Sequence, residues 1–244
     1  MTDGAFRSRQ SVTPGSCRGH LPRFVVIDHE WEAPMRVDYR AAWVPFDHDN
    51  GQTPALLSLA VDWVERGCVA QGTSGVLIVS KKPINGYPQP IQAFAAHHEG
   101  TSRRGSAPRR KAPGPVLAHS LSLDDLDYAE HLARGSSLCA TEWPDVPLAG
   151  WAAARGALNL VTGEITPRPA DDVVVLLDHL HFVGNNGWSD GPGKRDAGQL
   201  LRELQAAAPD LDANYVASYQ FGLGDVSADS AKRLLALASK VTVL

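Results

Sequence analysis

The sequence is poor in the features that mark several large classes of protein. It has three cysteines, Cys17, Cys68 and Cys139, which are too scattered for a disulfide framework and never at the CxxC spacing of zinc or redox sites. No apolar run approaches the roughly 18 residues of a membrane span, and the N-terminal stretch lacks the apolar core of a signal peptide. We therefore expect a cytoplasmic protein that makes no contact with a membrane.

Charge of one sign is also missing, and so are the common catalytic signatures. A net charge of −4 gives no global attraction to nucleic acid, so any basic site must be local. The chain contains no Walker loop, GxGxxG fingerprint, HExxH or GxSxG. No motif therefore identifies a cofactor, which stays unknown at this stage, or a catalytic residue.

The clearest pattern present is a strand–helix–strand unit in the middle of the chain. A short apolar strand, Val116–Ala118, precedes Ser122, which lies three residues before Asp125 at the spacing of a capping box. A helix over 123–134 follows, and then a second strand, Leu138–Thr141. Two strands joined by a helix over so short a gap must run parallel. The unit places a parallel α/β sheet at the centre of the fold.

We predict a Rossmann-like, mainly parallel sheet with an N-terminal hairpin or edge pair, followed by a small all-helical subdomain. The expected parts are a flexible arm (1–22), an α/β domain (23–168) with a flexible basic loop (99–114), and the helical subdomain (169–244). Further strands are expected over 24–27, 35–44, 75–80 and 157–161, the last turning at Thr162-Gly163 into 164–166. Further helices are expected over 54–66, 90–98, 147–155, 172–183, 193–207, 211–220 and 228–240.

A candidate ligand site follows from the tendency of open parallel sheets to bind ligands outside the carboxyl ends of their strands. The residues at these ends supply a cation, an imidazole, a hydroxyl, a carboxylate and an aromatic ring. They are Lys81, His119, Ser120, Glu142 and Trp143. This set suits acid–base catalysis or the binding of an anion, to which helix starts near Ser122 and Pro147 would add positive potential. The alternative is a plain salt bridge between Glu142 and Lys81.

A second candidate is a surface for nucleic acid or another polyanion. The basic residues concerned are Arg103, Arg104, Arg109, Arg110, Lys111, Lys194 and Arg195. Around the last two, Gly191–Leu201 resembles the glycine hairpin of helix-hairpin-helix DNA-binding motifs, which implies phosphate contacts from backbone amides and Lys194. Charge opposes this reading, because residues 170–244 carry ten acidic and six basic side chains. The alternative is a structural turn whose Trp188 fills the subdomain core.

Metal ligands and a reactive thiol are weaker candidates. Asp28-His29-Glu30 and Asp47-His48-Asp49 contain suitable ligand types, but adjacent strand residues point to opposite faces, and turn polarity explains them equally. We assign no metal. Cys139 lies in an apolar strand, where inert packing is expected.

Three functional hypotheses follow. The first is an accessory protein that contacts nucleic acid or another polyanion through its basic segments. The second is an enzyme or sensor for a small anionic ligand, phosphorylated or nucleotide-like, at the strand-end crevice. The third is a scaffold for protein partners without catalysis. The chain as a whole resembles proteins from bacteria of high GC content, and this implies no activity.

Overall fold

The computed structural model describes residues 39–81, 83–105, 108, 114–189 and 191–241. Contacts divide the chain between Pro34 and Met35, and every described residue belongs to the second part. Several sequence-based predictions concern residues outside this set. They are the arm (1–22), the strand at 24–27, the cluster Asp28-His29-Glu30, and the side chains of Arg109, Arg110 and Lys111.

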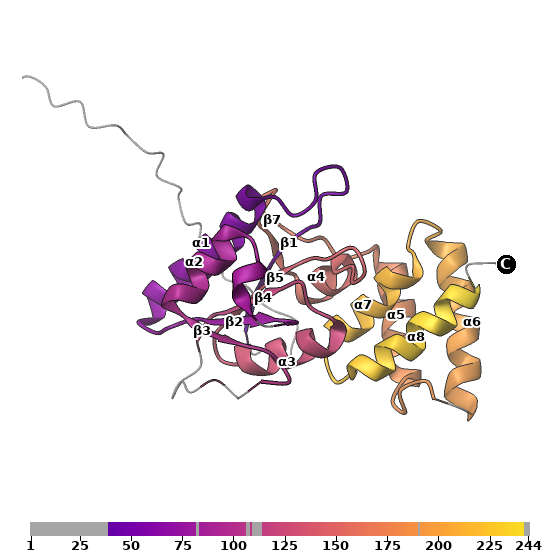
Figure 1. Ribbon diagram of the computed structural model, residues 1–244. Helices are drawn as coiled ribbons and strands as arrows, with labels where there is room; N and C mark the ends of the chain where they lie inside the picture. Colours follow the sequence, from indigo (N-terminus) through magenta and orange to yellow (C-terminus); the bar gives the residue numbers. More distant parts are fainter. Residues whose placement is uncertain (1–38, 82, 106–107, 109–113, 190, 242–244) are drawn as a thin grey trace, which may run out of the picture. The chain divides into compact units, whose positions relative to one another are not determined.

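Seven strands form one mostly parallel sheet in the order β3-β2-β4-β5-β1-β6-β7 (Figure 1). The strands are β1 (Arg40–Val44), β2 (Val76–Val79), β3 (Glu99–Thr101), β4 (Val116–His119), β5 (Ser137–Thr141), β6 (Leu158–Asn159) and β7 (Glu164–Ile165). All neighbours are parallel except β6 and β7. The prediction that β2, β4 and β5 are parallel neighbours is confirmed, so the architecture is a mixed α/β one.

The helices confirm most of the predicted ranges. They are α1 (Pro54–Gln71), the short 3-10 helix η1 (Ile84–Gly86), α2 (Gln89–His97), α3 (Leu123–Ala133), α4 (Ala149–Arg155), α5 (Asp171–Val183), α6 (Gly191–Ala207), α7 (Ala213–Gly222) and α8 (Ala228–Val241). None of the described helices is long and apolar enough to cross a membrane. The N-cap of the predicted capping box is present, because the Ser122 hydroxyl accepts the amide of Asp125 at 3.3 Å, and it also donates to the Asp125 carboxylate at 2.7 Å.

Helices cover both faces of the sheet. Leu57 and Val64 of α1 and Phe94 of α2 pack with Leu77 of β2 on one face. Leu126 of α3 and Trp151 of α4 pack on the other face, together with Phe221 of α7. The C-terminal helices therefore share a core with the sheet through α7, and among the described helices α4 and α7 make the most extensive contact.

Three details of the prediction were wrong, and each depends on contacts between distant segments. The strand expected in an N-terminal hairpin or edge pair is described over Arg40–Val44, and this β1 lies inside the sheet between β5 and β6. Residues 99–101, expected in the basic loop, form the edge strand β3 against β2. Helix α1, expected over 54–66, passes through Gly67, continues to Gln71 and closes on left-handed Gly72. Gly67 instead allows close packing, since a Cβ there would lie 3.1 Å from the Pro115 ring.

The hairpin near residue 163 is confirmed with a longer turn. Strands β6 and β7 pair antiparallel, and four residues separate them where two were expected. Gly163 has a φ of +75°, as the turn requires.

Candidate functional site

The connections of the sheet diverge at two points of its carboxyl edge, which we call the first and the second crevice. Strand β2 leads to α2 on one face, whereas its neighbour β4 leads to α3 on the other face. The same divergence occurs between β5, which leads to α4, and its neighbour β1, which leads to α1. Ligands of open α/β sheets bind at such points because the chain leaves a gap there. The first crevice holds the ends of β2 and β4, and the second holds those of β5 and β1.

His119 is the buried centre of the first crevice. It pairs with Thr141 across β4 and β5, and its Nδ1 lies 2.9 Å from the Thr141 hydroxyl. The Tyr87 ring, just before α2, meets the imidazole edge to face with centroids 5.5 Å apart. Burial lowers the pKa of His119 to about 4. The imidazole is therefore neutral at pH 7 and held by a hydroxyl on one side and a ring on the other.

Ser120 follows directly and has a strained backbone. Its φ is +51°, one of three positive values among the described non-glycine residues. A left-handed serine between a buried strand and a helix marks a sharp turn at the strand end, where Ser120 is half-buried. The Ser120 Oγ lies 3.2 Å from His119 Nε2. Ser120, His119 and Thr141 thus form one chain of hydrogen bonds.

Glu142 has a structural role that the sequence-based interpretation missed. Its side chain is buried, and its two carboxylate oxygens accept the amides of Phe46 at 2.7 Å and Leu148 at 2.6 Å. The positive start of α4, expected to attract a ligand anion, is therefore already occupied by this carboxylate. No ion pair joins Glu142 to Lys81 in the described part of the chain, so the salt-bridge alternative is wrong as well.

The five predicted residues are divided between the two crevices. Lys81 is exposed, and its backbone is fixed by the Tyr87 hydroxyl, which accepts from the Lys81 amide at 3.2 Å and donates to its carbonyl at 2.9 Å. Lys81, His119 and Ser120 belong to the first crevice. Glu142 and Trp143, whose ring is 42% exposed, belong to the second. Tyr87 was not predicted, because nothing local in the sequence relates it to strand β4.

The second crevice also contains a half-buried polar side chain, that of Gln52. The Gln52 side chain donates to the Glu142 carbonyl at 2.7 Å. Its own carbonyl oxygen is buried and has no hydrogen-bond partner among the described residues. A buried acceptor without a donor is unfavourable. The Gln52 oxygen is therefore available to accept a hydrogen bond at the carboxyl edge.

The metal candidates are explained by other contacts. Asp47 accepts hydrogen bonds from the side chain of Asn50 and from the amides of Asn50 and Asp49. These bonds lower the pKa of Asp47, and the bond from the Asn50 side chain has the largest effect. The cluster Asp47-His48-Asp49 is thus part of a hydrogen-bonded turn. Glu65, Cys68 and His98 also lie close together.

His98 cannot readily bind a metal in this arrangement. Its Nδ1 accepts the Gly75 amide at 3.0 Å, so its Nε2 carries the proton that it donates to Glu65 at 2.9 Å. Metal binding at Nε2 would require the other tautomer, in which two N–H groups would face each other at Gly75. Cys139 is fully buried, and burial raises the pKa of its thiol, as expected for inert packing.

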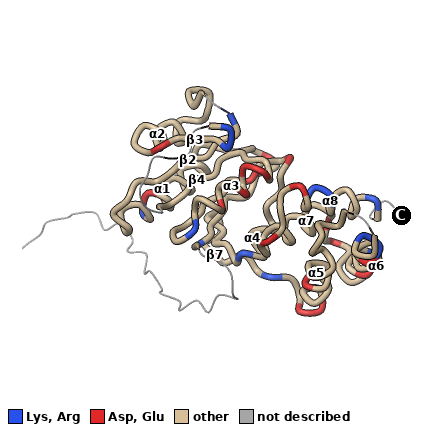
Figure 2. Tube along the Cα trace, turned by 90° about the horizontal axis from the view of Figure 1, so that it is seen from below, with Lys and Arg blue, Asp and Glu red and all other residues tan. Residues whose placement is uncertain are grey.

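The basic residues do not form one patch in the described part of the chain. Arg103 and Arg104 follow β3, whereas Lys194 and Arg195 lie in the first turn of α6, and Figure 2 shows basic residues spread over several elements. The glycines of the hairpin-like segment lie inside α6 and not between two helices. Trp188 is buried and donates its indole N–H to the Leu180 carbonyl at 3.2 Å, as the structural alternative expects. Contact with nucleic acid or another polyanion stays a prediction.

A concave region lies between α3 and the turn at residues 223–227. Its volume is about 520 Å³, within the range of small-molecule sites. Sequence reasoning missed it, although one signal was available. Asp124, Asp127, His131 and Arg134 recur at helical spacing along α3 and line one wall.

The lowered pKa of His119 makes the stability of the fold depend on pH. The unfolded imidazole binds a proton as the pH falls below about 6.5, whereas the folded one does so only near pH 4. Stability is therefore complete above pH 6.5 and falls as the pH drops from 6.5 to 4, by about 3 kcal/mol in total. Urea unfolding at pH 7 and pH 4.5 measures this loss. We expect His119→Gln to lose less stability over the same interval, and an equal loss in both proteins would contradict the assignment.

No family model, curated protein or solved structure matches this chain.

Proposed function

We propose that this chain is an enzyme that acts on a small molecule at the first crevice of a Rossmann-like sheet. In this proposal Ser120 is the nucleophile, His119 is the general base and the reaction is acyl transfer from an ester. The observation that carries it is the position of the Ser120 hydroxyl, 3.2 Å from Nε2 of the buried, neutral His119 imidazole. The backbone of Ser120 is left-handed at this point. A cytoplasmic location is part of the same proposal.

The hydrogen bonds support a complete proton path. The Ser120 oxygen attacks the ester carbonyl carbon while its proton passes to His119 Nε2. The tetrahedral adduct then collapses, the bond to the alcohol oxygen breaks, and His119 returns the proton to that oxygen. Water releases the acyl group from Ser120 by the same route, with His119 again taking and returning a proton.

The same geometry sets an expectation for the rate. Thr141 orients the imidazole through Nδ1 but carries no charge. It cannot stabilise the imidazolium as the carboxylate of a serine–histidine–aspartate triad does. The low pKa of His119 also indicates that the imidazolium is poorly stabilised. We therefore expect slow turnover.

Lys81 supports a substrate with an anionic group. It is an exposed cation of the first crevice, and the Tyr87 hydroxyl, whose ring contacts His119, fixes its backbone. Near the start of α3 the Asp125 carboxylate repels an anion, so the ligand anion is expected on the Lys81 side. A phosphate or carboxylate held there would bring an ester carbonyl toward Ser120.

Hydrolysis of two chromogenic esters tests the proposal. The probes are p-nitrophenyl acetate, which is neutral, and the p-nitrophenyl monoester of succinate, which is anionic. We expect the chain to hydrolyse both and to prefer the anionic ester. His119→Gln should lower kcat by about 10²-fold or more, Ser120→Ala should abolish turnover, and Lys81→Met should remove the preference.

Matched variants separate chemistry from folding. Ser80→Ala removes an exposed hydroxyl from the end of β2, and Lys240→Met removes a distant exposed lysine, so both should behave as the unchanged chain. Ser120→Gly accepts the positive φ without strain and should fold well but remain inactive. Hydrolysis that survives in both Ser120→Ala and Ser120→Gly, or no hydrolysis by the intact chain, would contradict the proposal.

A further inference from the structure

We propose that the cleft between α3 and residues 223–227 is a second binding site, which takes an elongated zwitterion with an amino group at one end and a carboxylate at the other. The site lies on the outer face of α3 and is separate from the carboxyl edge of the sheet. It is independent of the reaction proposed for Ser120. The argument rests on three features: a fixed floor, an ordered charge pattern along one wall, and the spacing of the charges.

The floor of the cleft is a buried ion pair that needs no ligand. Arg155 donates to both carboxylate oxygens of Glu130 at 2.8 to 3.1 Å, and the two side chains are only 5% and 12% exposed. Glu130 also accepts from the Tyr39 hydroxyl at 2.5 Å and the Trp151 indole at 2.7 Å. The Arg155 guanidinium lies 5.3 Å from the Tyr39 ring centre. This saturated network forms a rigid base and leaves recognition to the walls.

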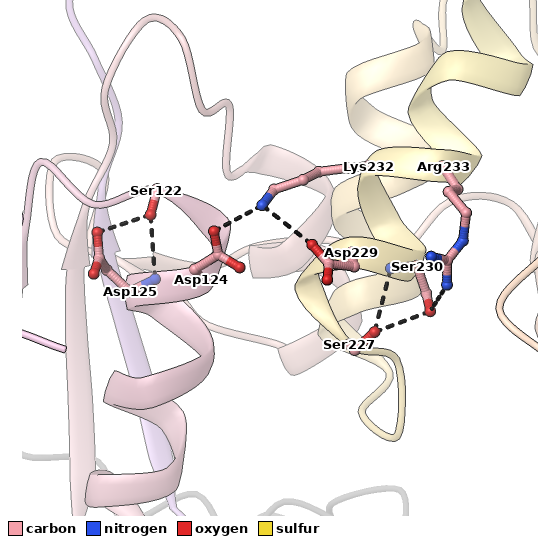
Figure 3. A network of polar contacts seen from close by, with 8 residues as sticks. All are labelled: Ser122, Asp124, Asp125, Ser227, Asp229, Ser230, Lys232 and Arg233. Atoms are coloured by element: carbon pink, nitrogen blue, oxygen red, sulfur yellow. Dashed lines mark hydrogen bonds and ion pairs between the residues drawn. The ribbon is translucent and has the colours of Figure 1, made fainter. Parts of the chain in front are cut away.

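One acid of the wall is already neutralised at the start of α3. Lys232 of α8 lies 2.7 Å from the Asp124 carboxylate and 3.6 Å from that of Asp229, as Figure 3 shows. This contact also ties α8 to α3 beside the cleft. Asp124 is therefore not the group that selects a ligand.

The remaining charges of α3 are ordered along the wall. Asp127 lies near the middle of the helix, His131 lies one turn further on, and Arg134 follows as the C-cap residue of α3. Arg103, from the segment after β3, adds a cation to the same cleft. A ligand along this wall would meet the Asp127 carboxylate at one end and the Arg134 guanidinium at the other.

The environment of Asp127 supports a ligand cation at its end. Burial and the neighbouring Asp124 raise the pKa of Asp127, although His131, Arg103 and Arg134 act in the opposite direction. The charged form of Asp127 is thus disfavoured, and a cation beside it would favour that form. An ammonium group would supply this positive charge.

The spacing of the charges excludes a compact zwitterion. Asp127 and Arg134 are seven residues apart, or about 10 Å along a helix axis. The charges of a simple α-amino acid are too close together to reach both ends. A molecule whose amino and carboxylate groups are separated by several bonds, such as a dipeptide or an ω-amino acid, fits the cleft.

Isothermal titration calorimetry of the full chain with three probes of equal length tests the charge pattern. The probes are 6-aminohexanoate, adipate and hexane-1,6-diamine, which present one charge of each sign, two negative charges and two positive charges. We expect 6-aminohexanoate to bind at least about tenfold more tightly than the other two. Equal or tighter binding of adipate or the diamine, or no binding of any probe, would overturn the proposal.

Variants then assign the two ends of the site. Asp127→Asn should weaken the binding of 6-aminohexanoate about tenfold and reduce its preference over adipate. Arg134→Gln should reduce the preference for 6-aminohexanoate over the diamine. Both side chains are exposed, so thermal unfolding should be little changed. Asp62→Asn and Arg66→Gln make the same chemical changes on exposed positions of α1. If these controls weaken binding as much as the cleft variants do, the cleft is not the site.

Discussion

Replacing Glu130 by alanine is expected to lower the free energy of unfolding by about 3–5 kcal/mol, the range for breaking a buried ion pair. The Arg155 side chain is 5% exposed and has its charge balanced by this carboxylate. Without Glu130, a guanidinium, an indole N–H and a phenol O–H lose their acceptor together. Urea unfolding of the purified variant measures the loss.

Two controls separate the buried charge from the volume of the side chain. In the double variant Glu130→Gln with Arg155→Met, the charges leave together, and the loss should be smaller than in Glu130→Ala. Lys232→Met breaks the more exposed pair with Asp124, where less than about 1 kcal/mol is expected. If Glu130→Ala loses no more than Lys232→Met, the floor of the cleft is not held as described.

Replacing Gly150 by alanine is expected to lower the free energy of unfolding by about 3 kcal/mol, at the upper end of the usual range for overpacking. A Cβ at this position of α4 would overlap the Tyr215 carbonyl oxygen and lie 2.7 Å from the Tyr219 nitrogen. Both atoms belong to the backbone of α7 and cannot rotate away. Helices α4 and α7 would have to move apart. This movement would loosen the core that joins the C-terminal helices to the sheet.

Gly198→Ala provides the matched control for this change. Gly198 lies inside α6, and a Cβ there would meet nothing within 4 Å. Alanine is the better helix former by about 0.5–1 kcal/mol, so this variant should be slightly more stable. Thermal unfolding of both variants checks the pair, and equal stability of the two would contradict the close contact between α4 and α7.

Local patterns were enough to predict the elements but not their order in the sheet. The cap at Ser122 and the apolar runs of β2, β4 and β5 depend on neighbouring residues, and these predictions were confirmed. The position of β1 between β5 and β6 depends on pairing over about a hundred residues, which leaves no periodic signal. The edge strand β3 contains only Glu, Gly and Thr and owes its conformation to β2.

The same distinction applies to the candidate site. The strand-end rule found His119 and Ser120 because it needs only the end of strand β4. It could not find the positive φ of Ser120, the Tyr87 ring, or the use of Glu142 as an anchor for Phe46 and Leu148. These features require loops to fold back over the sheet, and the cleft beside α3 likewise combines segments far apart in the sequence.

The most direct test of the Ser120 assignment is covalent labelling of the intact chain with a fluorophosphonate. This reagent phosphonylates an activated serine with loss of fluoride. Intact mass and peptide mapping should find one adduct, on Ser120, formed more slowly in His119→Gln and absent from Ser120→Ala. No adduct on the intact chain, or equal labelling of Ser80 and Ser120, would contradict a nucleophilic Ser120 activated by His119.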